Sequence, residues 1–296
     1  VDMLRYMAGW PTKLTGKTVP VSSPGEWHAY TLRDPVGVVA QIVPWNGPLM
    51  MAIWKVAPAL AAGCTIVLKP AEQTPLTALF LAELAVEAGI PEGVFNVVLG
   101  GAEVGAAMSS HSDIDKIAFT GSTDVGKRIA RAVAGTGKKL TLELGGKSPN
   151  IIFEDASIDQ AVEGIIQGIY FNQGHVCCAG SRLFVQESIL DTVIEKLRHR
   201  LSTLRVGDPL DKNTDIGAIN SRQQLDTIRK YLDAGSSEGA GLCISGTPGR
   251  GLEDWAPETP IPNGNTKGYW CRPCFFTGVQ PSHVIAREEI FGPVLS

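Results

Sequence analysis

One stretch of the sequence places two thiols in a setting suited to covalent chemistry. Residues 170–182 have the sequence Tyr-Phe-Asn-Gln-Gly-His-Val-Cys-Cys-Ala-Gly-Ser-Arg, so Cys177 and Cys178 stand close to several small residues. A lone cysteine is most often a small buried hydrophobe, but a tight backbone can present the sulfur to a substrate. A thiolate that attacks a carbonyl carbon forms a tetrahedral adduct. The stretch therefore contains a candidate nucleophile.

Three further segments accompany this stretch in a fixed order. They are Pro44-Trp45-Asn46-Gly47-Pro48, Leu142-Glu143-Leu144-Gly145-Gly146-Lys147 and Glu288-Glu289-Ile290-Phe291-Gly292-Pro293. With these four motifs the chain closely resembles the aldehyde dehydrogenase superfamily, whose members oxidise aldehydes to acids with a nicotinamide cofactor, and within it the phenylacetaldehyde dehydrogenases. The resemblance covers nearly the whole chain but begins part-way into the family's cofactor domain. We therefore expect a fragment that lacks both ends of the family's chain.

The resemblance implies a role for each catalytic candidate. Cys177 corresponds to the nucleophile, and Cys178 to a neighbour that lines the substrate pocket. The side-chain amide of Asn46 and the backbone N–H of Cys177 would stabilise the oxyanion of the adduct. Glu143 resembles the general base that activates water against the thioester, and Lys55 a lysine near that water. Taken alone, Asn46 could equally be a turn residue and Glu143 a solvated charge.

The resemblance also implies an NAD site. Lys69 and Glu72 look like the pair that holds the adenine ribose, and Glu72 would repel a 2′-phosphate, which favours NAD over NADP. A turn at Gly121-Ser122 would place a helix N-terminus beside the pyrophosphate. The other expected cofactor contacts are Trp45, Glu289 at the nicotinamide ribose and Phe291 near the nicotinamide ring.

Two positions depart from the family pattern. His175 stands where the family usually has Gln, and either a packing change or a titratable group near the thiol would explain it. Gly47 stands where many relatives carry a bulky aromatic residue, so one wall of the substrate tunnel is missing. We therefore expect a roomy, apolar pocket for a bulky or aromatic aldehyde, lined by Gly47, Met51, Trp54, Tyr170, Phe171 and Cys178.

Two other functions remain open at this stage. A truncated pseudoenzyme or interaction fragment would keep the fold and lack activity, and the incomplete ends favour it. A coenzyme A-acylating relative would commonly lack the general base, so the presence of Glu143 disfavours it.

Composition narrows the classes of partner. The chain has 296 residues, 44% hydrophobic and 19% charged, with a net charge of -4. This balance disfavours nucleic acid and acidic membrane surfaces as partners. Short apolar runs predict no membrane span, and the first residues show no secretory signal, so we expect a cytoplasmic protein. The resemblance implies a homo-oligomer, dimer or tetramer, in the full-length form.

The six cysteines do not suggest a disulfide framework in a chain of this length. Cys271-Arg-Pro-Cys274 has the spacing of a redox pair or of half a zinc site. No second pair or nearby histidines accompany it, and its aromatic neighbours favour a strand, so we expect no metal site.

Alternating strands and helices must position these residues. An α/β fold with a doubly wound parallel sheet is predicted, with ligands at the carboxyl ends of the strands, where Asn46, Lys69, Gly121 and Glu143 fall. Thr74 and Pro75 should start one helix as N-cap and first residue. The expected strands are 36–43, 64–68, 94–99, 116–120 and 140–144, and the expected helices include 53–62 and 103–110.

Gly145-Gly146 is the expected junction between two domains. Residues 1–144 would form the NAD-binding domain, with an oligomerisation hairpin at 18–31, and residues 145–296 a second α/β domain that carries the nucleophile. We expect folding to bring Cys177, Asn46 and Glu143 into one cleft. The second domain should contain strands 150–153 and 182–186, helices 189–204 and 222–232, a helix bearing the apolar stripe Ile158, Val162, Ile165 and Ile169, and a surface loop at 246–268.

Overall fold

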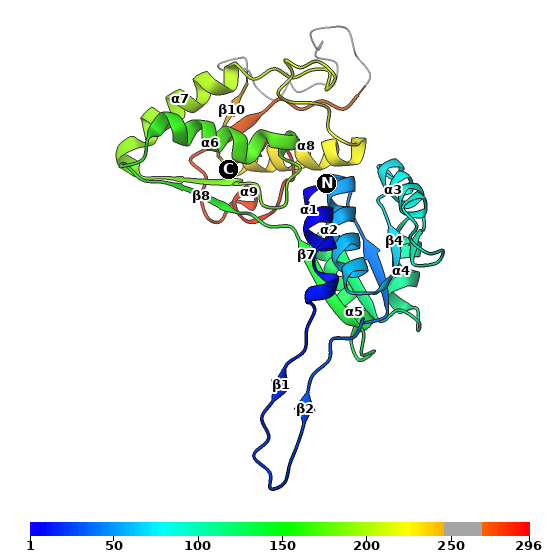
Figure 1. The fold of residues 1–296 in the computed structure, drawn as a ribbon. Helices are drawn as coiled ribbons and strands as arrows, with labels where there is room; N and C mark the ends of the chain where they lie inside the picture. The colour runs from blue at the N-terminus through cyan, green and yellow to red at the C-terminus, as the bar shows by residue number, and fades with distance from the viewer. Residues whose placement is uncertain (246–267) are drawn as a thin grey trace. The chain divides into compact units, whose positions relative to one another are not determined.

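The fold is described from a computed structural model, which describes residues 1–245 and 268–296 (Figure 1). Its backbone contacts divide the chain into two compact units, Val1–Leu144 and Gly145–Ser296. The boundary lies at the expected Gly145-Gly146 junction. The surface loop expected at 246–268 lies, apart from its last residue, outside the described residues.

The first unit is built on a five-stranded parallel sheet with strand order β5-β4-β3-β6-β7. A helix connects each strand to the next along the chain, which is the doubly wound arrangement predicted from the sequence. The strands are β3 (Val38–Ile42), β4 (Thr65–Lys69), β5 (Phe95–Val97), β6 (Lys116–Gly121) and β7 (Lys139–Leu144); the helices are α2 (Pro48–Ala61), α3 (Leu76–Glu87), α4 (Ala102–Ser110) and α5 (Thr123–Val133).

Apolar side chains of the central strands are buried because helices cover both faces of this sheet. On one face Ile42 and Ile117 pack with Met108 of α4 and Ile129 of α5. On the other face, Ile66 and Leu68 of β4 pack with side chains from α2 and α3, among them Met51, Val56 and Ala78. Continuous burial on both faces explains why β3 and β4 have near-continuous apolar sequences.

Two helix starts differ from the expectation. Helix α2 begins at Pro48 and not at residue 53, because a proline at the first helical position gives up an N–H that has no intrahelical partner. Helix α3 begins at Leu76, with Pro75 in the cap position and no side-chain cap hydrogen bond. The prediction of Thr74 as N-cap was therefore wrong.

The expected hairpin at 18–31 is present in the first unit. Strands β1 (Thr18–Val19) and β2 (Ala29–Tyr30) pair antiparallel, with Thr18 opposite Tyr30. Helix α1 (Asp2–Ala8) and the short helix η1 (Pro11–Lys13) precede the hairpin, and α1 contacts α2. Most side chains of the hairpin are exposed, Trp27 with 65% of its surface.

The second unit contains two small sheets that backbone hydrogen bonds connect. Strands β8 (Pro149–Ile152) and β9 (Arg182–Val185) are parallel, and β10 (Gly241–Ile244), β11 (Cys274–Thr277) and β12 (Val294–Leu295) form the other sheet. Leu183 donates to the carbonyl of Ser296, and Ser296 donates to that of Ser181, so the end of β12 lies along the start of β9. The helices are α6 (Ile158–Tyr170), η2 (Phe171–Gly174), η3 (Glu187–Ile189), α7 (Leu190–Ser202), α8 (Arg222–Ser237) and α9 (Val284–Arg287).

The apolar stripe predicted on α6 forms part of a core. Val162, Ile165 and Ile169 are buried together with Val193 and Leu197 of α7. Leu225, Ile228 and Leu232 of α8 pack with Cys274 and Phe276 in a second cluster. These two clusters account for the amphipathic pattern of the three long helices in this unit.

The Cys271/Cys274 pair lies in the core of the second unit. Both side chains are almost completely buried, at 2% and 0% exposure, and burial raises the pKa of each thiol. Within residues 1–245 and 268–296, no group of His, Cys, Asp and Glu side chains is arranged to hold a metal ion. In the same described part of the chain, no helix has the length and apolar character needed to cross a membrane.

Candidate functional site

The carboxyl edge of the parallel sheet gathers the polar candidates of the first unit. Asn46 lies in the loop between β3 and α2, Lys69 ends β4, and Gly121 ends β6. Ile42 pairs with Lys69, and Thr120 pairs with Glu143. Because all five strands are parallel, these residues lie along one edge, on both sides of the point between β3 and β6 where the direction of winding reverses. This is the position at which doubly wound sheets bind ligands.

Lys55 and Glu143 interact at this edge. Helix α2 holds Lys55 half-buried, and its carbonyl accepts a hydrogen bond of 2.8 Å from the Gln41 side chain on β3. Burial lowers the pKa of the Lys55 ammonium, the exposed Glu143 carboxylate opposes that shift, and Lys116 adds to it. The pair therefore consists of an ammonium group with a lowered pKa and a carboxylate near it.

Lys69 lies with its side chain only 7% exposed and donates a hydrogen bond of 3.1 Å to the carbonyl of Pro70. Burial lowers its pKa, while the carboxylates of Glu72 and Glu103 raise it. Glu103 is a residue that the sequence analysis missed. The signal that could have revealed it is an acidic residue just after Gly100-Gly101, at the start of a predicted helix.

The turn at Gly121-Ser122 starts α5 as expected. Ser122 is the N-cap, and its hydroxyl accepts a long hydrogen bond of 3.4 Å from the N–H of Val125. A Cβ on Gly121 would lie 2.5 Å from the Phe119 ring, so only glycine fits beside that ring. This leaves an exposed helix N-terminus with Asp124 in its first turn.

In the second unit, an unusual backbone leads to the two adjacent cysteines. Asn172, Gln173 and Gly174 all have positive φ angles, of 49°, 57° and 73°. The Gln173 side chain supports this turn by accepting a hydrogen bond of 3.0 Å from the N–H of Gly217. Left-handed conformations at non-glycine residues are costly and cluster at functional sites. The turn delivers Cys177 and Cys178 to the surface, where both side chains are exposed.

The Cys177 thiol is accessible, but its surroundings in the second unit raise its pKa and do not lower it. Partial burial is the main cause that raises its pKa, the neighbouring Cys178 raises it further, and backbone N–H groups of the loop oppose the shift. At neutral pH the sulfur is therefore mostly protonated. A base that takes this proton is required before the sulfur can act as a nucleophile.

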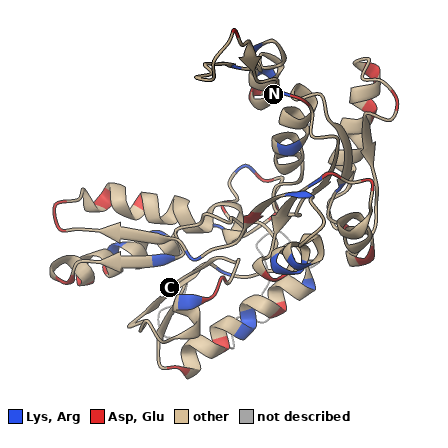
Figure 2. Ribbon diagram, turned by 90° about the horizontal axis from the view of Figure 1, so that it is seen from below, with Lys and Arg blue, Asp and Glu red and all other residues tan. Residues whose placement is uncertain are grey.

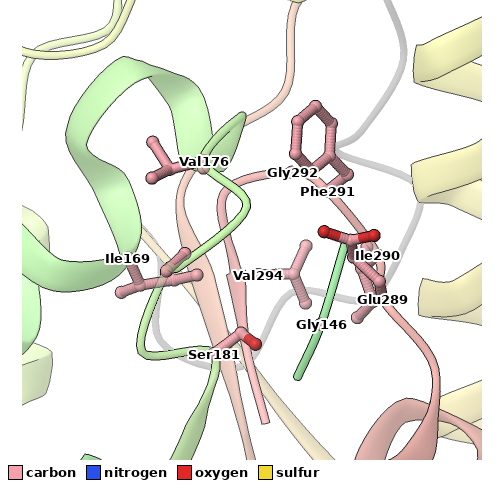
Figure 3. Close-up of a pocket in the computed structure, with 11 residues that line it drawn as sticks. Gly146, Ile169, Val176, Ser181, Glu289, Ile290, Phe291, Gly292 and Val294 are labelled. Atoms are coloured by element: carbon pink, nitrogen blue, oxygen red, sulfur yellow. The ribbon is translucent and has the colours of Figure 1, made fainter. Parts of the chain in front are cut away.

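A pocket lies beside the cysteine loop (Figure 3). Val176 and Ala179 of the loop contribute to one wall, and Glu289 and Phe291 to another. The remaining lining residues are Gly146, Ile169, Gly174, Ser181, Ile290, Gly292 and Val294. The pocket therefore combines mostly apolar walls with one carboxylate, next to an exposed thiol.

The Glu289 carboxylate is packed against the backbone at residues 145 and 146. A Cβ on Gly145 would overlap the carboxylate, so glycine is needed there. Burial raises the pKa of Glu289, whereas the N–H of Gly146 and the charge of Lys147 lower it. Its Oε1 atom is buried and has no hydrogen-bond partner among the described residues. Such an acceptor is suited to a hydroxyl group of a ligand.

His175 is a buried neighbour of Phe291. Its side chain is 2% exposed, and its ring centroid lies 5.7 Å from that of Phe291, with the two planes inclined by 30°. Burial lowers the pKa of His175 to about 4. The imidazole is therefore neutral at physiological pH and acts as a packing partner of Phe291, the first of the two explanations raised from the sequence.

The residues expected to line the substrate pocket have different environments. Tyr170 is 1% exposed, and its hydroxyl donates a hydrogen bond of 2.8 Å to the carbonyl of Cys274. The prediction that Tyr170 lines the pocket was wrong, because the side chain is held in the core. Phe171 and Trp54 are exposed by 61% and 51%, and Met51 is buried among the core residues of the first unit. Gly47 is the N-cap of α2.

The chain is similar along its whole length to known enzymes. Residues 1–296 match the aldehyde dehydrogenase family. The chain is 48% identical to human mitochondrial aldehyde dehydrogenase, with 99% of this chain and 54% of that protein aligned. It spans little more than half of the length of the relatives that it matches.

Solved structures agree with the sequence matches. An NAD+ complex of an aldehyde dehydrogenase from Bacillus cereus has a TM-score of 0.89 and 48% identity, with 98% of this chain and 56% of that chain aligned. A betaine aldehyde dehydrogenase from Staphylococcus aureus in complex with NAD+ has a TM-score of 0.90 and 39% identity, with 99% and 57% aligned.

Proposed function

The chain belongs to the aldehyde dehydrogenase family, and we propose that it takes part in oxidising an aldehyde to a carboxylic acid with NAD. The observation that carries this proposal is the exposed thiol of Cys177, three residues after a left-handed turn, in a loop whose Val176 and Ala179 line a pocket together with Glu289 and Phe291. A nucleophilic thiol beside a pocket suits a reaction that passes through a covalent adduct.

In the first step, the Cys177 thiolate attacks the carbonyl carbon of the aldehyde and forms a thiohemiacetal oxyanion. The side-chain amide of Asn46 and the backbone N–H of Cys177 would stabilise that oxygen. When the C=O bond re-forms, hydride leaves the carbon, and NAD is the acceptor that takes it, giving a thioester and NADH. The aldehyde carbon is thereby oxidised by two electrons.

In the second step, water releases the acid and regenerates the thiol. Glu143 would remove a proton from this water, and Lys55, which interacts electrostatically with Glu143, would stabilise the carboxylate form. The presence of this carboxylate favours hydrolysis over transfer of the acyl group to coenzyme A. It also argues against a catalytically silent fragment, because each catalytic candidate is present in the chain.

The residues of this chain fit the two ribose groups of NAD. The buried Oε1 of Glu289, with no partner among the described residues, could accept a hydrogen bond from the nicotinamide ribose, and Phe291 would pack near the nicotinamide ring. Lys69 and Glu72 would hold the adenine ribose, and Trp45 with the Gly121-Ser122 turn would complete the cofactor contacts. An N-terminus such as that of α5 favours a pyrophosphate.

A pair of cysteine variants tests the proposal. In the intact protein, Cys177→Ala should lower aldehyde oxidation below detection while NAD binding persists, because the sulfur forms the covalent bond. Cys178→Ala is the matched control, since it removes an equally exposed thiol one residue away. Formation of NADH and binding of NAD, the latter by calorimetry, are measured for both. Activity retained by Cys177→Ala and lost by Cys178→Ala would reassign the nucleophile.

The substrate is proposed to be a bulky or aromatic aldehyde. Gly47 has no side chain where many relatives carry a bulky aromatic residue, and the atoms nearest to the position of a Cβ there are Cε of Met50 at 3.3 Å and Cγ of Met51 at 3.9 Å. Phenylacetaldehyde should therefore have a higher kcat/KM than acetaldehyde, and Gly47→Phe should reduce this preference. A preference of the unmodified protein for acetaldehyde would refute the proposal.

A homo-oligomer is proposed for the intact protein. The hairpin of β1 and β2 supports it, because Trp27, Tyr30 and Leu32 leave 65%, 59% and 71% of their surface exposed. Large apolar side chains on an extended hairpin are typical of contacts with another chain.

A further inference from the structure

At the N-terminus of helix α4, the carboxylate of Glu103 accepts hydrogen bonds from backbone N–H groups. Gly101 is the N-cap of this helix, and its N–H donates a hydrogen bond of 2.9 Å to Oε1 of Glu103. The N–H of Glu103 itself also bonds to the carboxylate, and together these bonds lower the pKa of Glu103. Two N–H groups at this end of the helix, those of Gly101 and Glu103, are therefore satisfied from within the chain.

A second carboxylate approaches the same point. A Cβ on Gly101 would lie 2.8 Å from Oε2 of Glu103 and 3.2 Å from Oε1 of Glu72. The carboxylates of Glu72 and Glu103, from the loop after β4 and from α4, thus both lie close to Gly101. Both act on the buried ammonium of Lys69. Two carboxylates face one ammonium, so this group of side chains carries a net negative charge.

We propose that Glu103 is a specificity-determining residue that, together with Glu72, excludes a 2′-phosphate on the adenine ribose. It does so in two ways: it occupies the N–H groups of Gly101 and Glu103, which could otherwise bind a phosphate, and it adds a second negative charge beside Lys69. The inference rests on the proposed function, because it takes Lys69 and Glu72 as the adenine-ribose site. It assigns to Glu103 a part of the discrimination that the sequence analysis gave to Glu72 alone.

The test compares the dissociation constants of NAD and NADP for the intact protein, measured by calorimetry. In Glu103→Gln the amide oxygen can still accept the hydrogen bond of Gly101, so the helix start is kept and only the charge is lost. We expect the ratio Kd(NADP)/Kd(NAD) to fall by about fivefold to tenfold, as for loss of one charge near a phosphate in a high-dielectric setting. The change should shrink at high salt.

Two further variants distinguish this role from the effect of losing a negative charge elsewhere in the protein and from the effect of losing a contact to the ribose. Glu87→Gln removes the same charge at the last residue of α3, the end of that helix away from the ligand edge, and should leave the ratio unchanged. Glu72→Gln should lower the ratio and also weaken NAD binding, because it loses a contact to the ribose. Glu103→Gln should leave the Kd of NAD within about twofold, since the charge of residue 103 acts on the 2′-phosphate, which NAD lacks.

An unchanged ratio in Glu103→Gln would overturn the inference. So would an equal weakening of both coenzymes with a lower Tm, because that result assigns Glu103 to capping alone. If the unmodified protein binds neither coenzyme, the proposed function fails together with the inference. If NAD binds and the ratio does not respond to residue 103, only the inference fails.

Discussion

Burial decides what each cysteine of this chain can do. Cys64, Cys271 and Cys274 are between 0% and 5% exposed, and they act as small apolar core residues. Cys177 and Cys178 are exposed because the turn that begins at Asn172 carries the backbone outward. Since the raised pKa of Cys177 leaves its thiol protonated at neutral pH, the proposed reaction would depend on a base as much as on the sulfur.

His175 gives a prediction about stability at acidic pH. Its pKa is about 4 in the folded chain, against about 6.5 in an unfolded chain. Between these values the unfolded chain binds a proton that the folded chain does not, so the free energy of unfolding falls as pH decreases. From pH 8 to pH 5 this histidine should remove about 2 kcal/mol of stability.

Urea unfolding at both pH values measures this contribution. His175→Gln should lose about 2 kcal/mol less than the unmodified protein between pH 8 and pH 5, because glutamine does not titrate. His28→Gln is the control, since His28 lies exposed on the hairpin. Equal pH dependence for His175→Gln and the unmodified protein would show that the imidazole is not held neutral.

At the scale of elements, the end of α6 is attached to the sheet of the second unit. Tyr170 is the last residue of α6, and its hydroxyl bonds to the carbonyl of Cys274 on β11. The turn that carries Cys177 starts at the next residues. This hydrogen bond therefore fixes the start of the loop that carries Cys177, the proposed nucleophile, relative to the strands, while the supporting bond from Gly217 to Gln173 fixes the turn that follows.

Removal of the Tyr170 hydroxyl tests this attachment. Tyr170→Phe should lower the free energy of unfolding by about 1–3 kcal/mol, because a buried carbonyl loses its donor. Tyr6→Phe, at a side chain that is 60% exposed, should change it by less than about 0.5 kcal/mol. Denaturant unfolding of both variants provides the comparison. An effect at Tyr170 no larger than at Tyr6 would mean that the hydrogen bond does not stabilise the fold.

In the whole molecule, charged residues of both signs are distributed along the chain. Basic and acidic residues are intermixed along the helices (Figure 2), in agreement with the small net charge of -4. In the first unit, large apolar side chains are exposed on the two short strands of the hairpin and also on α2 and α3. A two-stranded hairpin is only marginally stable by itself in water, so a second chain is the expected support.

The hairpin gives a prediction about assembly. In the intact protein, the double substitution Trp27→Ser and Tyr30→Ser should shift the oligomer toward monomer, because it removes apolar area proposed to be buried between chains. Sedimentation velocity measures the shift. Phe80→Ser on α3, which is 60% exposed, is a control for loss of surface hydrophobicity. An oligomer unaffected by the hairpin substitutions would place the interface elsewhere.

Local sequence patterns were enough to predict the order of strands and helices in the first unit and the position of the polar candidates at strand ends. Alternating β-branched runs and helical patterns have different periods, and these are local properties of the chain. For the same reason the hairpin and the apolar stripe of α6 could be predicted. Helix starts at Pro48 and Leu76 could not, because capping depends on which backbone donors find partners in the folded chain.

Which of the predicted residues are accessible depends on the folded chain. Tyr170 and Phe171 are adjacent aromatic residues in the sequence, yet one is sealed in the core and the other is 61% exposed. In the same way, the structure revealed Glu103 beside Glu72 and Lys69, and Glu289 against Gly145. Burial, ionisation and contacts between side chains arise from atoms that are distant in sequence, so no local pattern encodes them.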